Sequence, residues 1–162
     1  ASSSSSQEMF LDSENCLIVD EEDRILREGT KREVHWRQSM SLHRAFSVFA
    51  FTPDHKLILQ KRAQSKVTFP SLWTNTCCSH PIKHMELEES NGVQGCKRAA
   101  IRKLEHELNL KGRKEEELHF MGRFLYKAIS DGDEWGEHEL DYAFILKNIN
   151  EDFVKEPNED EV

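Results

Sequence analysis

The stretch "SNGVQGCKRAAIRKLEHELNL" (residues 90–110) decides the fold, because here the apolar residues change to helical spacing. They recur every three or four positions, at Val93, Cys96, Ala100, Leu104 and Leu108. The charged side chains fall on the other faces, as they do in an amphipathic helix that covers a core. We therefore predict one long helix in this stretch.

The residues before this helix are rich in aromatic and branched side chains, which are typical of strands. Residues 16–20 and 25–34 predict two strands joined by an acidic turn. Residues 43–52 and 56–62 predict a hairpin, and its first strand is apolar enough to be buried on both faces. The next apolar run, 68–79, contains a proline, so we expect an edge strand or a loop that enters a strand.

Two further strand-like runs, 118–130 and 137–147, follow the helix and are joined by a turn-rich segment. The order of strands, one helix and strands predicts an α+β fold, in which the helix packs on one face of a mixed sheet. The Ser-rich residues 1–9 are expected to form a flexible tail. We assign residues 10–162 to a single domain.

The composition excludes several classes of partner. The chain has 22 Lys and Arg against 30 Asp and Glu, so its net charge of −8 argues against nucleic acid. Its apolar runs are far shorter than the roughly 20 residues that span a bilayer, so no membrane partner is expected. The four cysteines, two of them adjacent, do not suggest a disulfide framework. We expect a cytoplasmic protein that acts on a small molecule.

Three histidines and two glutamates are candidate metal ligands. His35, His43 and His80 lie on early or loop-like segments, and Glu137 and Glu139 share one face of a strand because alternate residues point the same way. Imidazoles and carboxylates are ligands for zinc, manganese or iron. The alternative is that the histidines are hydrogen-bonded structural residues and the glutamates form a solvated strand face. The residues alone leave both interpretations open.

The adjacent thiols Cys77 and Cys78 also allow several interpretations. A disulfide between sequence neighbours is strained, which argues against a redox switch. A free buried cysteine usually packs as a small apolar residue. However, Cys78 and His80 would project to the same side of an extended segment. A thiol beside a metal-bound imidazole has its acidity tuned and can donate or accept a proton.

Several basic residues in this acidic chain are candidates for binding an anion. Arg62 and Lys66 are four positions apart after a strand and would reach the same ligand at its end. Glu107 lies on the predicted helix, where it could hold a divalent cation against phosphate oxygens or pair with Lys103 one turn away. A solvated surface is the alternative for each residue. The basic candidates are Lys31, Arg62, Lys66, Arg102 and Lys103.

Six motifs in order resemble the type I isopentenyl-diphosphate isomerases, a branch of the Nudix superfamily. They are "LHRAFSVF" (42–49), "TFPSLWTNTCCSHP" (68–81), "ELEES" (86–90), "RAAIRKLEHEL" (98–108), "YKAISDG" (126–132) and "WGEHELDY" (135–142). The resemblance implies a Nudix-like fold. It also implies an isomerase of isoprenoid biosynthesis that interconverts isopentenyl diphosphate and dimethylallyl diphosphate by protonation and deprotonation.

The resemblance implies a role for each candidate residue. Cys78 and Glu139 would be the acid and the base, in an order that stays open, and Tyr126 would hydrogen-bond or relay the proton beside Glu139. Cys77 would be a packing residue. The metal ligands would be His35, His43, His80, Glu137 and Glu139, holding Zn²⁺ or Mn²⁺. The diphosphate would be bound by Lys31, Arg62, Lys66, Arg102 and Lys103, with Mg²⁺ held by Glu107.

Two other functions are alternatives to the isomerase. The first is a Nudix-type diphosphate hydrolase, which needs several carboxylates in its helical box to hold metals. Aligned on Glu107, this chain has Lys103, His106 and Asn109 where that box has two glutamates and a glycine. The second alternative is a truncated, inactive relative that binds metal.

The sequence departs from the isomerase pattern in two places. Ser71 replaces a glycine that commonly follows "FP", which matters if the backbone there has a positive φ. Family members also continue past "PNE" with a strand, a helix and a "TPW" segment, and we expect this region to be absent. A bare sheet face would then favour a homodimer, lower stability or an inactive protein.

Overall fold

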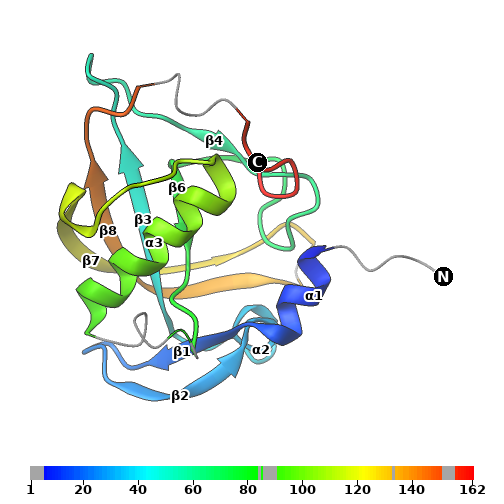
Figure 1. Ribbon diagram of the computed structural model, residues 1–162. Coiled ribbons are helices and arrows are strands. Elements are labelled where there is room, and N and C mark those ends of the chain that lie inside the picture. Colours follow the sequence, from blue (N-terminus) through cyan, green and yellow to red (C-terminus); the bar gives the residue numbers. More distant parts are fainter. Residues whose placement is uncertain (1–5, 84, 86–90, 133, 151–155) are drawn as a thin grey trace.

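We obtained a computed structural model of the chain, and it describes residues 6–83, 85, 91–132, 134–150 and 156–162. Its helices are α1 (Ser6–Ser13), α2 (Lys31–His35), α3 (Gly92–Leu108) and the short 3₁₀ helix η1 (Glu115–Glu117). Its strands are β1 (Asn15–Val19), β2 (Ile25–Thr30), β3 (His43–Ala50), β4 (Gln60–Lys61), β5 (Trp73–Thr74), β6 (Cys77–Ser79), β7 (Leu118–Ile129) and β8 (Gly136–Leu146). Figure 1 shows α3 lying across the sheet.

The main sheet has six strands and is mixed, as predicted. Its order is β2-β1-β3-β8-β7, and β6 pairs with β3 beside this path. Strands β3 and β8 run parallel, in a register that sets His43 opposite Glu139 and Ala50 opposite Leu146. The other pairs are antiparallel. The centre of the sheet therefore joins segments that are about a hundred positions apart in the chain.

The two faces of the central strands have different roles. Phe46, Val48 and Phe144 point to the α3 side and are fully buried in the apolar core. Because successive side chains alternate between faces, Ser47 and Glu139 point to the opposite side. That side carries the polar residues of the site. The prediction that the 43–52 strand is buried on both faces is confirmed over the length of β3.

Helix α3 confirms the prediction from residues 90–110. The Asn91 side chain accepts a hydrogen bond from the Gln94 backbone N–H and caps the first turn. Asn109 ends the helix in the left-handed conformation, with φ of 55°. Leu104 and Leu108 are buried on the face that meets the sheet. Burial of each side chain stabilises the folded state by about 2 kcal/mol.

Two of the strand predictions before α3 are only partly confirmed. The strand predicted over 25–34 ends at Thr30, whose side chain accepts from the Glu33 N–H and begins α2. The hairpin of 43–52 and 56–62 forms only beside its turn, where the Thr52 N–H donates to the Lys56 carbonyl oxygen and the Ile58 N–H to the Ala50 carbonyl oxygen around the isolated bridge Phe51–Leu57. Along the rest of its length β3 pairs with β1, β6 and β8, and β4 pairs with β5.

The remaining elements agree with the sequence. Residues 118–130 and 137–147 form β7 and β8. Residues 68–79 form a loop that enters β5 and β6, and Ser71 in it has φ of 60°. Of the expected tail, residues 1–5 lie outside the described residues, whereas residues 6–9 belong to α1. Within the described part of the chain, no helix has the length and apolar character needed to span a membrane.

Candidate active site

Four side chains from distant elements form a buried cluster on the face of the sheet opposite α3. His35 comes from the end of α2, His43 from the start of β3, His80 from just after β6, and Glu139 from β8. The imidazole centroids lie 4.8 to 4.9 Å apart. One donor atom from each of the four residues lies within 4.8 Å of the others. The three histidines therefore form one group rather than separate structural residues.

Backbone hydrogen bonds orient two of these imidazoles. The Nδ1 of His35 lies 2.7 Å from the Lys31 carbonyl oxygen, and the Nδ1 of His43 lies 2.8 Å from the Ser41 carbonyl oxygen. A carbonyl oxygen only accepts, so each Nδ1 carries the proton and each Nε2 keeps a free lone pair. The Nε2 of His43 is buried and has no hydrogen-bond partner among the described residues.

The electrostatics of the cluster fit a transition-metal ion. Burial lowers the pKa of His43 to about 4. Burial, together with the charge on His43, holds the pKa of His35 and of His80 well below the usual value. All three imidazoles are thus neutral near pH 7, as metal ligands must be. The Nε2 of His80 lies 2.8 Å from Oε1 of Glu139, which completes a set of three nitrogen donors and one oxygen donor.

Glu137 lies beside this cluster but does not belong to it. It precedes Glu139 by two residues on β8 and faces the same side, as predicted. Its Oε1 accepts a hydrogen bond of 2.8 Å from the Thr68 hydroxyl. Burial raises the pKa of Glu137, and burial followed by the charge of Glu137 raises the pKa of Glu139 well above its usual range. A role of Glu137 as a metal ligand stays a prediction.

The adjacent cysteines face opposite sides of the sheet. Strand β6 sets Cys78 opposite Ser47 and Cys77 opposite Val48. Cys77 therefore packs in the core, with its Sγ 3.4 Å from Oε2 of Glu107. Both thiols are free. Burial raises the pKa of Cys78 to about 12, so this thiol is protonated near neutral pH.

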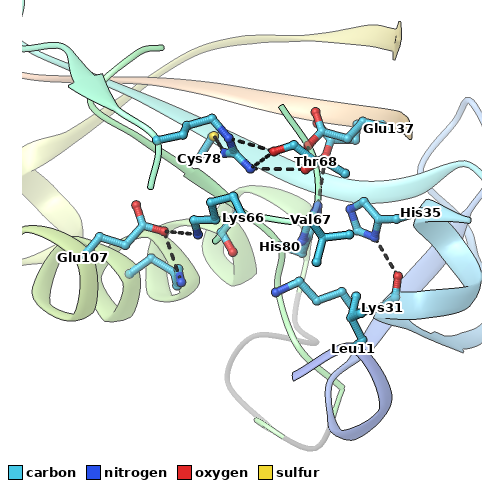
Figure 2. Close-up of a pocket in the computed structure, with 14 residues that line it drawn as sticks. Leu11, Lys31, His35, Lys66, Val67, Thr68, Cys78, His80, Glu107 and Glu137 are labelled. Carbon is cyan, nitrogen blue, oxygen red and sulfur yellow. Dashed lines mark hydrogen bonds and ion pairs between the residues drawn. The ribbon is translucent and has the colours of Figure 1, made fainter. Parts of the chain in front are cut away.

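Two adjoining cavities share Arg62, Cys78, Glu137 and Glu139. The first has a volume of about 60 Å³ and is lined by the basic candidates Lys31, Lys66 and Lys103 as well as His35, His80 and Glu107. In Figure 2, Lys66 and Glu107 lie on one side of this cavity, and His35 and Lys31 lie on the other. The second has a volume of about 320 Å³ and is lined by more apolar side chains, including Phe49, Phe69, Leu72, Trp73 and Phe124.

The predicted anion-binding residues fall into two groups. Four of them line the first cavity: Lys31, Arg62, Lys66 and Lys103. Arg102 is not part of that lining, and its Nη2 donates to the His80 carbonyl oxygen at 3.1 Å. Glu107 is almost fully buried, and its Oε1 lies 3.1 Å from the Lys103 ammonium. The pairing of Glu107 with Lys103 is therefore present.

Tyr126 lines the second cavity. It stands directly opposite Glu139 in the antiparallel register of β7 and β8. Side chains of directly opposed residues lie on the same face of a sheet and are close neighbours. Burial raises the pKa of Tyr126 to about 12, so its phenol keeps its proton near neutral pH.

The structure adds two carboxylates that the sequence analysis missed. Asp141 continues the alternation of Glu137 and Glu139 along β8, and this period of two is the signal that would have found it. Glu161 is only 3% exposed and forms ion pairs with Lys66 and Lys103 at the first cavity. No local pattern marks Glu161, because it lies in an acidic segment more than 50 positions from both lysines in sequence.

Comparison with known proteins decides the family. A family model described as the NUDIX domain matches residues 41–162. The isopentenyl-diphosphate Delta-isomerase 1 of Mesocricetus auratus is 44% identical over 159 residues, which cover 94% of this chain and 69% of that protein. The chain belongs to the isopentenyl-diphosphate isomerases of the NUDIX family.

Two other isopentenyl-diphosphate isomerases give a similar result. The protein of Gibberella zeae is 45% identical over 92% of this chain and 62% of its own length. The protein of Schizosaccharomyces pombe is 46% identical over 87% of this chain and 65% of its own length. The chain therefore spans slightly less than two thirds of these two relatives.

A solved structure supports the fold of this isomerase family member. DR0079 from Deinococcus radiodurans matches with a TM-score of 0.58 and covers 91% of this chain and 78% of its own. Its sequence is 15% identical, so the likeness concerns the fold alone. Together with the observed mixed sheet and α3, it confirms the predicted Nudix-like α+β fold.

Proposed function

We propose that this protein interconverts isopentenyl diphosphate and dimethylallyl diphosphate by protonation at one carbon and deprotonation at another. One observation carries the proposal: Cys78, Glu139 and Tyr126 line one cavity whose neighbour is lined by basic side chains. A five-carbon chain would occupy the more apolar cavity, and its diphosphate would lie toward Lys66 and Lys103. The family to which the chain belongs supports the same assignment.

The proposed chemistry needs two groups that exchange protons with carbon. An alkene is a weak base, so the acid must be held close to it in a site with little water. Glu139 is buried and Cys78 is partly buried, and both have raised pKa values, which favours their protonated forms. In a reversible reaction the group that donates in one direction accepts in the other. Tyr126 is positioned to hydrogen-bond beside Glu139.

The metal assignments are part of the proposal. His35, His43, His80 and Glu139 would hold Zn²⁺ or Mn²⁺, with Glu137 as a further ligand. An ion bound there would withdraw charge from Glu139 and set its acidity. Mg²⁺ held by Glu107 would neutralise part of the diphosphate charge.

The diphosphate would be bound by the basic side chains of the first cavity. Lys66 and Lys103 are mostly buried and converge on Glu107, so their charges are concentrated in a small volume. Lys31 and Arg62 line the same volume from other elements. Arg102 would act through the backbone of His80, to which it is hydrogen-bonded. The same lining contains Glu107, Glu137 and Glu139, so the four basic side chains would bind the diphosphate together with Mg²⁺ held by Glu107.

We also propose a cytoplasmic location, which is supported by four free cysteines in the chain. A small-molecule substrate agrees with the acidic net charge of −8, which disfavours nucleic acid. Sedimentation of the purified protein would test whether it forms a homodimer.

Proton NMR of isopentenyl diphosphate in deuterium oxide tests the function. We expect the metal-loaded protein to produce dimethylallyl signals and to incorporate deuterium into the five-carbon chain. Cys78→Ser and Glu139→Gln should each lower the rate at least about 100-fold. Cys96→Ser is the matched control, because Cys96 is a buried thiol on α3 outside both cavities. It should keep most of the parental rate.

Two results would contradict the proposal. Release of inorganic phosphate or pyrophosphate without deuterium incorporation would indicate a hydrolase. An unimpaired Cys78→Ser variant would remove the thiol from the reaction. Metal content measured on each variant would separate loss of chemistry from loss of the metal.

A further inference from the structure

Asp141 is a buried carboxylate of the second cavity to which the proposed reaction gives no role. It follows Glu139 by two residues on β8, so both side chains point to the same face of the sheet. Its exposed fraction is 4%. It lines the same cavity as Cys78, Glu139 and Tyr126. A charged group at such a position needs a partner, because removing it from water is costly.

Only one of the two carboxylate oxygens of Asp141 has a hydrogen-bond partner among the described residues. The Ser47 hydroxyl donates a hydrogen bond of 2.7 Å to Oδ2 of Asp141. The other oxygen, Oδ1, is buried and has no hydrogen-bond partner among the described residues. No basic side chain in the described part of the chain forms an ion pair with Asp141. Arg62 lines the cavity as well, but its guanidinium donates to the carbonyl oxygens of Thr68 and Phe69.

The neighbours of Asp141 indicate what the free oxygen would meet. Phe124 stands opposite Asp141 in the β7–β8 register, and Ser47 stands opposite Cys78 in the β3–β6 register. Asp141 therefore lies on the sheet floor among groups that would contact the hydrocarbon rather than the diphosphate. Aromatic side chains, including Phe49, surround the same volume and reduce its polarity. A negative charge acts strongly on a nearby positive charge in such surroundings.

We propose that the Asp141 carboxylate, oriented by Ser47, faces the five-carbon chain and stabilises the positive charge that develops on its branching carbon. This inference rests on the proposed isomerase function. It adds a group that touches the reacting part of the substrate without exchanging a proton with it. Protonation of the alkene creates a full positive charge inside the cavity, and preorganised negative charge lowers the energy of that state.

A pair of ligands isolates the charge from the rest of the substrate. One is a diphosphate in which a tertiary ammonium nitrogen replaces the branching carbon. The other is its isostere isopentyl diphosphate, which has a saturated carbon without charge at that position. Calorimetric titration of the metal-loaded protein at pH 8 gives the affinity for each. The ratio of the two affinities reports the preference for a positive charge at that position, because the diphosphate and the length are unchanged.

We expect Asp141→Asn to lower this preference about tenfold while the affinity for isopentyl diphosphate stays within twofold. The kcat of isomerisation should fall at least tenfold, with little change in KM. Asp131→Asn removes the same charge from an exposed position of the β7–β8 turn and should change neither quantity. If Asp141→Asn does not fold, Asp141→Ser, which is uncharged and smaller, gives the same expected loss.

A folded Asp141→Asn or Asp141→Ser protein that keeps the parental preference within twofold would overturn the inference. Equal losses of affinity for the two ligands would also overturn the inference, because they would indicate that Asp141 has a structural role. The proposed function fails separately, through the absence of dimethylallyl signals from the parent protein. The ligand preference can be measured in either case, so the two failures are distinguishable.

Discussion

Replacing Glu161 with glutamine should lower the free energy of unfolding at pH 7 by on the order of 3 kcal/mol. Glu161 forms ion pairs with Lys66 and Lys103, and its exposed fraction is only 3%. Burial by itself raises the pKa of Glu161, but the two lysines outweigh it and bring the pKa from 4.5 to about 2. Each unit of that shift corresponds to about 1.4 kcal/mol of stabilisation of the charged form.

The pH dependence follows from the sign of this shift. The folded pKa lies below the unfolded one, so the stabilisation is fully present above pH 4.5 and is lost as the pH falls toward 2. At pH 3.5 the stabilisation should be smaller than at pH 7 by about 1.4 kcal/mol. The difference in stability between parent and Glu161→Gln should shrink by that amount, because the other titrating groups are the same in both proteins.

Urea unfolding followed by tryptophan fluorescence measures this difference. Glu159→Gln serves as the matched control, since Glu159 is an exposed carboxylate two positions away. It should change the free energy of unfolding by less than about 0.5 kcal/mol. The reasoning is refuted if Glu161→Gln and Glu159→Gln are equally stable at pH 7, or if the gap between parent and Glu161→Gln is the same at pH 7 and pH 3.5.

Three further predictions concern the metal cluster, the loop and the core. His43→Ala should weaken zinc binding by on the order of 100-fold, measured in competition with a chromophoric chelator. His119→Ala, on the exposed side of β7, should leave zinc binding unchanged. Equal losses of zinc affinity in the two variants would argue against the metal cluster. Ser71→Gly should raise the free energy of unfolding by about 0.5 kcal/mol, because Ser71 has φ of 60°, and an unchanged urea midpoint would contradict strain there. Phe144→Ala should lower the free energy of unfolding by about 3–5 kcal/mol in the same assay, because Phe144 is fully buried. Leu59→Ala, whose side chain is half exposed, should lower it by less than about 1 kcal/mol. Similar losses of stability in the two variants would contradict the assigned core.

Much of the secondary structure could be predicted because it depends on local patterns. The spacing of Val93 to Leu108 marks α3, and the apolar runs mark β3, β7 and β8. The predicted hairpin is limited to a short pairing beside its turn, because strand pairing is not local. Residues 56–62 have strand composition, yet β8 and β6 occupy the edges of β3. The short helix α2 was missed because its start depends on a single cap, the side chain of Thr30.

The site could be predicted in its chemistry but not in its geometry. The donor types of His35, His43, His80 and Glu139 were visible, and the resemblance to a family indicated which of them act together. Asp141 was overlooked although it follows the same alternation on β8. The contact of Glu161 with Lys66 has no local signal at all, because it joins segments 95 positions apart.

The amino-acid sequence by itself determined the kinds of side chain present, the helical face of α3 and the alternation that puts Glu137, Glu139 and Asp141 on one side of β8. Only the tertiary structure decided which of these groups meet. The parallel pairing of β3 with β8 brings His43 to Glu139, and the pairing of β6 with β3 turns Cys78 toward the cavity and Cys77 toward the core. The physical reason is that such pairings are selected by burial of the whole sheet and not by the preferences of neighbouring residues.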